Sequence, residues 1–397
     1  MPLDRKLSGC QVFWPDKMPV GWLCEPLGNR MVLNYGRALK DEARKPGDTD
    51  VYGSNGIVGT HREVWLKPPG IVVGRKGTVG SIHFAQRDYW PIDTAYYVVP
   101  EAGDDIGYLF YLLDYLPLKS LNAATGVPGL SRRDAYALRG TFPEKHEQSA
   151  IASMLDVVDS AIRRARQAVD SAKQLQRSLL ADAFARMEAQ PRKLREFTTD
   201  VRYGTSKASS SRQWGNPVLR IPNVVGDQLT LADLAFVELS PTDVGRLALT
   251  DGDLLLVRTN GNPNYVGRSA VFRAPDERTW IYASYLIRVR LNAELLADYV
   301  NVYLGIERGR RELLRRVTTS AGNHNINSNS IRLLTIPVPR NIEVQKEVID
   351  IAWRCRTTIG ALGQKVEALM ALKKSLLHDL LTGTVRLDPA LFAETSA

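Results

Sequence analysis

Two long segments of the chain have the apolar periodicity of a helix. Residues 150–187 contain no Pro or Gly, and residues 344–381 contain only Gly360 and Gly363 as weak points for a helix. Alternating steps of four and three residues connect apolar side chains over about five heptads in each segment, which is typical of coiled-coil packing. We therefore predict two long helices that pair with each other.

The predicted heptad core positions are mostly aliphatic, and each segment has one polar residue among them, Gln176 and Lys373. Two long helices inside an ordinary helical domain would show the same period, but the segments ahead of each helix are β-rich. The core positions include Ile151, Leu155, Val158, Ile162, Val169, Leu179, Val348, Ile359, Leu362, Val366, Leu369 and Leu376.

The two segments belong to an internal duplication. SLLADAF at 178–184 recurs as SLLHDLL at 375–381, a shift of 197 residues. A repeat of this kind fixes the architecture before any single motif is considered. The same shift aligns Gln148 with Gln345, Ser131 with Ser328 and Gln176 with Lys373.

The segments ahead of the helices follow a common β-rich plan. Residues 70–84 read as two short apolar strands around a turn, and residues 252–272 repeat that layout with a longer loop. An aromatic strand follows each, at 92–99 and 281–289. We predict an α+β fold with two globular β-rich domains and two long helices. The predicted bounds are 1–143 and 191–340 for the domains, 144–190 and 341–386 for the helical segments, and 387–397 for a C-terminal tail.

The net charge of the chain is one indication of a polyanionic partner. The net charge is +9, and the excess of basic residues lies mainly in 192–340; binding to a polyanion and simple solubility explain it equally well. Neither a signal peptide nor a stretch near the roughly 20 apolar residues of a membrane span is present. We therefore expect a cytoplasmic protein without a membrane partner.

Cys10, Cys24 and Cys355 are too far apart for a zinc site and odd in number, so we expect reduced thiols.

Basic and amide side chains at strand ends are the candidate DNA contacts. Arg75 and Lys76 lie in the Gly-containing turn of the first hairpin, and Arg258 ends the corresponding strand of the second. Long donors on a rigid base suit contact with a phosphate or with guanine, and an Asn amide suits an adenine edge. For Asn260 and Asn262, a role in turn conformation is an equally good explanation.

Three polar loops complete the candidate surface: 124–134, 203–215 and 318–332. A disordered connector is the simpler interpretation of 318–332, but the interposed Ile326 favours an ordered loop. The candidate DNA-binding residues are Arg75, Lys76, Arg132, Arg133, Ser206, Lys207, Arg212, Arg220, Arg258, Asn260, Asn262, Tyr265, Asn323, His324 and Asn325.

Catalytic motifs are weak. Residues 262–265, Asn-Pro-Asn-Tyr, lack the second Pro of the adenine methyltransferase motif Asn-Pro-Pro-Tyr, and no Gly-rich cofactor loop precedes them. There is no P-loop, residues 15–17 stand alone as a nuclease motif, and the five His residues lack metal-ligand spacing. We expect no catalytic residue and no bound metal.

Specific sequence strings occur in both halves of the tandem plan. They are VYGSNGIVG, GRKGTVGSI and WPIDTAYYV in the first half, and YGTSK, GDLLLVRTNG, VGRSAVF and YASYLIRV in the second. Together with the junctions at 144–162 and 341–359, these strings make the chain resemble the specificity subunits of type I restriction-modification enzymes over nearly its whole length.

The resemblance implies a non-catalytic DNA-binding subunit with two target recognition domains, each contacting half of a split sequence in double-stranded DNA. It also implies an antiparallel pair of helices that binds two methyltransferase subunits, and restriction-translocase subunits where the system has them. S-adenosylmethionine, ATP and Mg²⁺ would act in those partner chains. The alternatives are a subunit of a methyltransferase-only or type IIB/IIG-like system, a self-contained adenine methyltransferase, and a coiled-coil adaptor without DNA binding.

Overall fold

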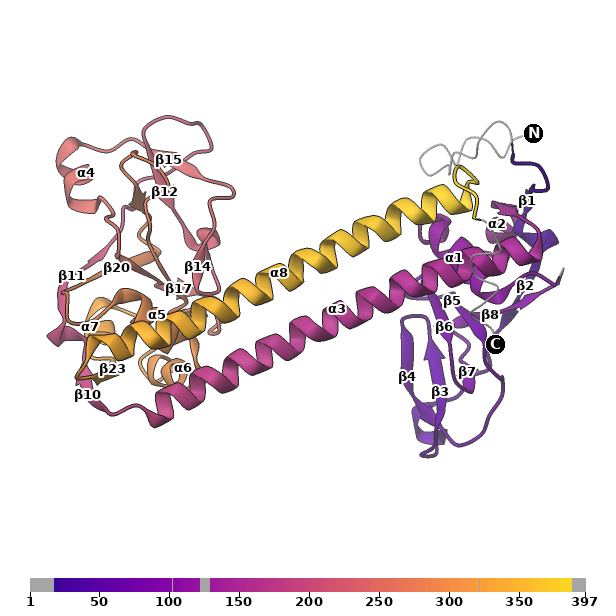
Figure 1. Ribbon diagram of the computed structural model, residues 1–397, viewed down its shortest axis with the longest axis horizontal. Coiled ribbons are helices and arrows are strands. Elements are labelled where there is room, and N and C mark those ends of the chain that lie inside the picture. Colours follow the sequence, from indigo (N-terminus) through magenta and orange to yellow (C-terminus); the bar gives the residue numbers. More distant parts are fainter. Residues whose placement is uncertain (1–17, 102, 122–128, 321, 388–397) are drawn as a thin grey trace. The chain divides into compact units, whose positions relative to one another are not determined.

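The computed structural model describes residues 18–101, 103–121, 129–320 and 322–387, and it divides into two compact units. The first unit comprises residues 1–166 and 364–397, and the second comprises residues 167–363 (Figure 1). Each unit therefore contains one β-rich domain together with part of both long helices. Cys10, residues 15–17, residues 124–128 of the first polar loop and residues 388–397 of the predicted tail lie outside the described residues.

The first unit has two main sheets and a short strand pair. The four-stranded sheet is antiparallel, and the three-stranded sheet contains one parallel pair, β3 with β7. Their strands, in spatial order, are β2 (Met31–Tyr35), β8 (Ala95–Pro100), β5 (Gly70–Gly74) and β6 (Ile82–Ala85), then β4 (Gly56–His61), β3 (Thr49–Gly53) and β7 (Tyr89–Pro91), with β1 (Leu23–Pro26) paired to β9 (Arg139–Phe142).

The second unit repeats this topology strand by strand, so the duplication extends beyond the helices. The corresponding strands are β11 (Thr198–Tyr203), β20 (Leu286–Leu291), β16 (Leu254–Val257) and β18 (Ser269–Val271), then β15 (Ala235–Val237), β12 (Asn216–Leu219) and β19 (Ile281–Tyr282), with β10 (Ala189–Lys193) paired to β23 (Thr335–Pro339). The unit adds β13 (Val224–Val225) with β14 (Gln228–Leu229), and β17 (Thr259–Asn260) with β22 (Asn323–Asn325) and β21 (Thr318–Ser320).

Short helices also correspond between the units. They are α1 (Ile106–Tyr115) with α5 (Ala297–Gly305), and α2 (Arg132–Ala137) with α7 (Ser328–Arg332), while α4 (Pro241–Leu247) and α6 (Glu307–Leu314) occur in the second unit. The 3-10 turns are η1 (Leu27–Asn29), η2 (Asp41–Ala43), η3 (Leu118–Leu121), η4 (Leu194–Glu196) and η5 (Ile221–Asn223).

Buried polar contacts fix the correspondence of α1 with α5. The side-chain oxygen of Gln148 accepts from the backbone N–H of Asp105 at 2.8 Å, and that of Gln345 accepts from Leu296 at 2.9 Å. Each acceptor satisfies the N–H at the start of its short helix, a group that has no partner within the helix. Tyr108 in α1 and Tyr299 in α5 then donate to the carbonyls of Thr141 and Pro337. The matched pairs place Tyr111 of the first unit at the position of Val302 in the second.

The long helices are α3 (Lys145–Arg186) and α8 (Ile342–Leu381), and both fall within the predicted segments. In the first unit, Ile151 and Leu155 near the start of α3 share a core with Leu380 near the end of α8. In the second unit, Phe184 near the end of α3 shares a core with Val348 near the start of α8. The helices are therefore antiparallel, which confirms the predicted pairing.

Two details of the predicted alignment are wrong. Leu179 is 42% exposed, whereas Leu180 is 6% exposed and joins the core of the second unit. A helix with 3.6 residues per turn drifts against a strict heptad by about 20° per repeat, so the buried face moves to the next residue after several heptads. Ser131 caps α2 and corresponds to Asn327, the cap of α7, because the segment that leads from the short helix to the long helix is one residue longer in the second unit.

Candidate nucleic-acid interface

Arg75 directly follows β5 and lies over an aromatic ring. Its guanidinium carbon is 4.7 Å from the ring centroid of Tyr35, the last residue of β2, and one of its terminal amines donates to the carbonyl of Asp93 at 2.9 Å. Its backbone carbonyl accepts from Leu130 at 2.8 Å. A cation over a ring face is held electrostatically in a fixed orientation, so this charge is anchored at a strand end.

Arg258 has the same environment in the second unit. Its guanidinium carbon is 4.6 Å from the ring centroid of Tyr203, the last residue of β11, and it donates to the carbonyl of Ser284 at 3.4 Å. Its own carbonyl accepts from Ile326 at 2.9 Å. The structure thus places both predicted arginines at equivalent points. The two tyrosines were not among the residues expected from the sequence, although each ends the strand that opens its sheet.

The first unit adds a second cation to the same ring. Arg132, at the start of α2, lies 4.5 Å from the Tyr35 centroid, while Lys76 and Arg133 are exposed nearby in sequence. In the second unit, the corresponding place is filled by the backbone N–H of Ser328, which donates to the hydroxyl of Tyr203 at 3.0 Å. The first unit therefore carries more positive charge around its tyrosine.

Amide residues of the second unit gather on the small sheet β17-β22-β21. The register pairs Asn260 with His324 and Thr259 with Asn325, and it brings Asn323 onto the same ribbon. This ordered ribbon confirms that 318–332 is more than a connector. His324 contacts the hydroxyl of Thr319 at 3.1 Å.

The Asn side chains of the 258–268 loop also shape it. The side-chain oxygen of Asn260 accepts from the backbone of Asn262, and that of Asn262 accepts from the backbone of Asn264, both at 2.9 Å. The turn role considered from the sequence is therefore correct for these two residues. Their amide N–H groups are not used in these contacts, so the same residues retain donors for a nucleic acid.

Tyr265 lies in the same loop and is 41% exposed, with the Arg268 guanidinium carbon 3.9 Å from its ring centroid. Arg268 was not among the residues expected from the sequence. Arg310 supports the loop from α6, donating to the carbonyl of Val266 at 2.9 Å. The loop thus presents an aromatic ring and a cation from a braced backbone.

The remaining candidates lie on the loop between β11 and β12 and just beyond it. Ser206, Lys207 and Arg212 are exposed, and so is Trp214 at 72%, an aromatic residue that the sequence analysis passed over. Arg220 differs, because its guanidinium donates to the carbonyl of Asp233 and braces its own domain. Whether any of these residues contacts DNA stays a prediction.

The Asn-Pro-Asn-Tyr segment, weighed above as a methyltransferase motif, is a turn in the structure. Asn262, Asn264 and Tyr265 belong to the loop just described. Within the described ranges, no group of three or more His, Cys, Asp or Glu side chains could hold a metal ion. In the same part of the chain, no helix is long and apolar enough to cross a membrane.

Comparison with known proteins gives a family match in the first part of the chain. Residues 31–169 match the type I restriction modification DNA specificity domain. Over 286 residues the chain is 24% identical to the specificity subunit of the type I restriction enzyme EcoKI from Escherichia coli (strain K12) and 21% identical to that of StySPI from Salmonella potsdam. These alignments cover 68% of this chain but 61% of each relative, less than two thirds of their length.

Solved structures show that the fold is shared along the chain. The S subunit of a type I restriction-modification system from M. genitalium superposes with a TM-score of 0.64 at 15% identity, covering 94% of this chain and 98% of that one. A second chain, from a structure of type I R-M complex assembly and conformational transition, superposes with a TM-score of 0.59 at 14% identity, covering 94% and 100%.

Proposed function

We propose that this chain, which carries a type I restriction-modification DNA specificity domain, is the DNA-specificity subunit of such a complex and contacts a split target through its two β-rich domains. The observation that carries the proposal is the pair of equivalent arginines, Arg75 on Tyr35 and Arg258 on Tyr203. A duplicated cation at the same strand end gives each domain one anchored contact to the same polyanion.

The arginines that the two domains share and the ribbon that belongs to the second domain suit different kinds of DNA contact. Phosphate contacts position a protein on the duplex, whereas base contacts specify the sequence. Because Arg75 and Arg258 share one geometry, we assign them to the backbone. The β17-β22-β21 ribbon belongs to the second unit, and residues such as His324 and Asn325 on it are candidates for contact with base edges.

The long helices would bind the methyltransferase subunits. Large apolar side chains are exposed along them, and a protein–protein contact would remove such side chains from water. These residues are Val157, Leu175 and Leu179 on α3 and Trp353, Met370 and Leu372 on α8. In this proposal the chain itself is not catalytic. Methyl transfer with S-adenosylmethionine, and ATP- and Mg²⁺-dependent cleavage, belong to partner chains acting on cytoplasmic DNA.

The test is a footprint and a methylation map of the complex that this chain forms with type I methyltransferase subunits. We expect two protected stretches separated by a fixed gap and methylated adenines in a matching bipartite motif, because each domain contacts one half-site. A single contiguous footprint, or methyl transfer by this chain alone, would contradict the proposal.

A further inference from the structure

The duplicated architecture treats one equivalent position in two different ways. In the first unit, Tyr111 of α1 is buried against both long helices. Its hydroxyl donates to Asp156 at 2.7 Å and to Asp159 at 3.0 Å, and the ammonium of Lys373 lies 2.8 Å from the Asp159 carboxylate. Burial and the Asp156 contact raise the pKa of Tyr111, so its hydroxyl remains a neutral donor. The position is filled, and the Asp159 charge is paired with Lys373.

In the second unit, Tyr111, Asp159 and Lys373 are all replaced. Val302 stands at the position of Tyr111, Arg356 at that of Asp159 and Gln176 at that of Lys373, and all three line a cavity of about 1020 Å³. The smaller valine leaves the space that the tyrosine ring fills in the first unit. The exchange of Asp159 for Arg356 also changes the sign of the charge beside it.

The cavity is strongly basic. Seven basic and two acidic residues line it. Arg356 is paired with Asp227, and Arg311 lies 3.6 Å from Glu307, so five cations have no acidic partner among the described residues. Burial and the nearby charge of Arg268 lower the pKa of Arg310, which reflects this crowding. Cations held together in a recess cost free energy unless an anion compensates them.

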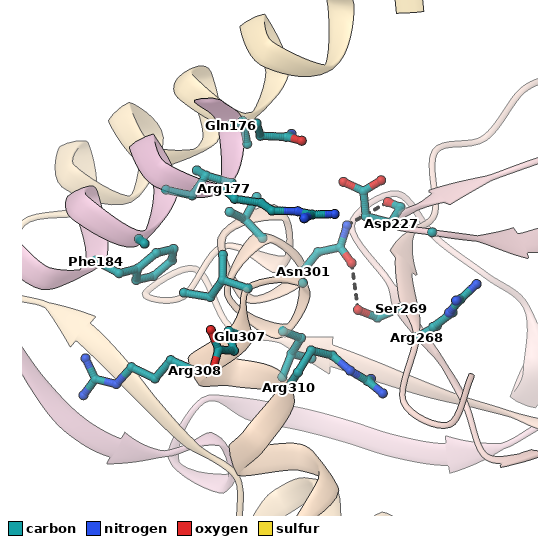
Figure 2. Close-up of a pocket in the computed structure, with 18 of the residues that line it drawn as sticks. Gln176, Arg177, Phe184, Asp227, Arg268, Ser269, Asn301, Glu307, Arg308 and Arg310 are labelled. Carbon is teal, nitrogen blue, oxygen red and sulfur yellow. Dashed lines mark hydrogen bonds between the residues drawn. The ribbon is translucent and has the colours of Figure 1, made fainter. Parts of the chain in front are cut away.

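Polar groups are also positioned on the cavity wall (Figure 2). Asn301 is 5% exposed, accepts from the hydroxyl of Ser269 at 2.7 Å and donates to the carbonyl of Asp227 at 2.9 Å. Figure 2 shows Arg177 extending from α3 toward Asn301 and Asp227, and no hydrogen bond or ion pair within the described residues holds its guanidinium. The Nε of Arg356 is buried and has no hydrogen-bond partner among those residues. The wall therefore offers unused N–H donors.

We propose that this cavity is a binding site for a phosphate group, with Arg177 as its principal ligand and Gln176 and Arg356 beside it. Guanidinium groups form paired, charge-assisted hydrogen bonds with phosphate oxygens, which matches the donors left unused here. The phosphate belongs either to a DNA backbone or to a free phosphorylated compound. Asn264, Gly267 and Arg268 of the candidate DNA-contacting loop form one wall, which places the site next to that surface.

Calorimetric titration of inorganic pyrophosphate into the full chain tests the site. We expect one saturable site per chain, weakened by about tenfold or more in Arg177→Gln, since the variant loses the charge-assisted hydrogen bonds of the guanidinium. Val302→Tyr, which introduces the residue of the first unit, should weaken binding by filling the space. Lys374→Gln is the matched control, because Lys374 is the exposed residue of α8 that corresponds to Arg177.

Absence of saturable binding, or equal weakening by Arg177→Gln and Lys374→Gln, would overturn the proposal. Arg177 is exposed on a helix, so its substitution should leave folding intact even if Val302→Tyr does not. A random-sequence duplex then identifies the source of the phosphate. Displacement of the duplex by pyrophosphate assigns the site to the DNA backbone, and simultaneous binding assigns it to a free compound. A chain that leaves a bipartite footprint but binds no pyrophosphate would contradict the cavity proposal alone.

Discussion

The side-chain amide of Gln148 donates a hydrogen bond to the carboxylate of Asp104 at 2.7 Å, and both residues are buried. Asp104 also pairs with Arg30 from the loop before β2. One glutamine of α3 thus connects the long helix to the start of α1 and to a buried ion pair. Gln345 occupies the same place in the second unit, where its amide donates to the carbonyl of Glu294 at 2.9 Å.

We expect Gln148→Ala to destabilise the first unit by about 1–3 kcal/mol, because it leaves the part-buried Asp105 N–H without its acceptor and removes one of the donors to the buried Asp104 carboxylate. Hydrogen exchange measures the effect unit by unit. Exchange should accelerate in α1 and remain unchanged in α5, and Gln345→Ala should give the reverse pattern. Equal acceleration in both units would show that the glutamines do not act locally.

Two neighbouring leucines of α3 provide a test of the helix packing. Leu180 is buried in the core of the second unit, and Leu179 is 42% exposed. Leu180→Ala should lower the free energy of unfolding by about 2–4 kcal/mol through lost burial and a cavity. Leu179→Ala should change it by less than about 0.5 kcal/mol. Denaturant titration of both variants decides, and a larger loss for Leu179→Ala would support the strict heptad instead.

These leucines also show how far the sequence predicts the structure. The repeat of SLLADAF and SLLHDLL is enough to predict two long paired helices, because local periodicity encodes them. It cannot fix which of two adjacent leucines is buried at the end of the helix. That choice depends on the slow drift between helix and heptad and on the domain packed against it.

Some residues of the candidate DNA-contacting surface could likewise be predicted from the sequence, and others could not. Arg75 and Arg258 could be found from their strand-end positions, but their stacking partners Tyr35 and Tyr203 lie on other strands of the sheet. The basic cavity was not predicted, since Val302, Arg356 and Gln176 come from three separate helices. Only the fold brings such residues together, and a single sequence contains no signal for that contact.

The anchored arginine of the second domain should matter for DNA binding in general rather than for one sequence. Arg258→Ala is expected to weaken binding to target and random duplexes alike and to reduce the slope of log K against log salt by about one, as for the loss of one phosphate contact. Fluorescence anisotropy at several salt concentrations measures both effects. Arg278→Ala is the control, because Arg278 is exposed in the same domain but paired with Asp276.

A selective loss for one target sequence in Arg258→Ala would assign the residue to a base instead. Arg258→Lys separates charge from geometry in the same assay. Lysine retains the charge but cannot stack a planar guanidinium on Tyr203, so we expect the salt slope to recover and the affinity to recover only in part.

Trp353 on α8 tests the proposed contact with the methyltransferase subunits. Its side chain is 60% exposed, so Trp353→Ala should leave the stability of the free chain nearly unchanged. A buried tryptophan at an interface commonly contributes 2 kcal/mol or more, so we expect the affinity for a methyltransferase subunit to fall by about 30-fold. Val385→Ala removes an exposed apolar side chain beyond the end of α8 and should have no effect. Unchanged affinity in Trp353→Ala, measured by surface plasmon resonance, would place the methyltransferase contact elsewhere on the chain.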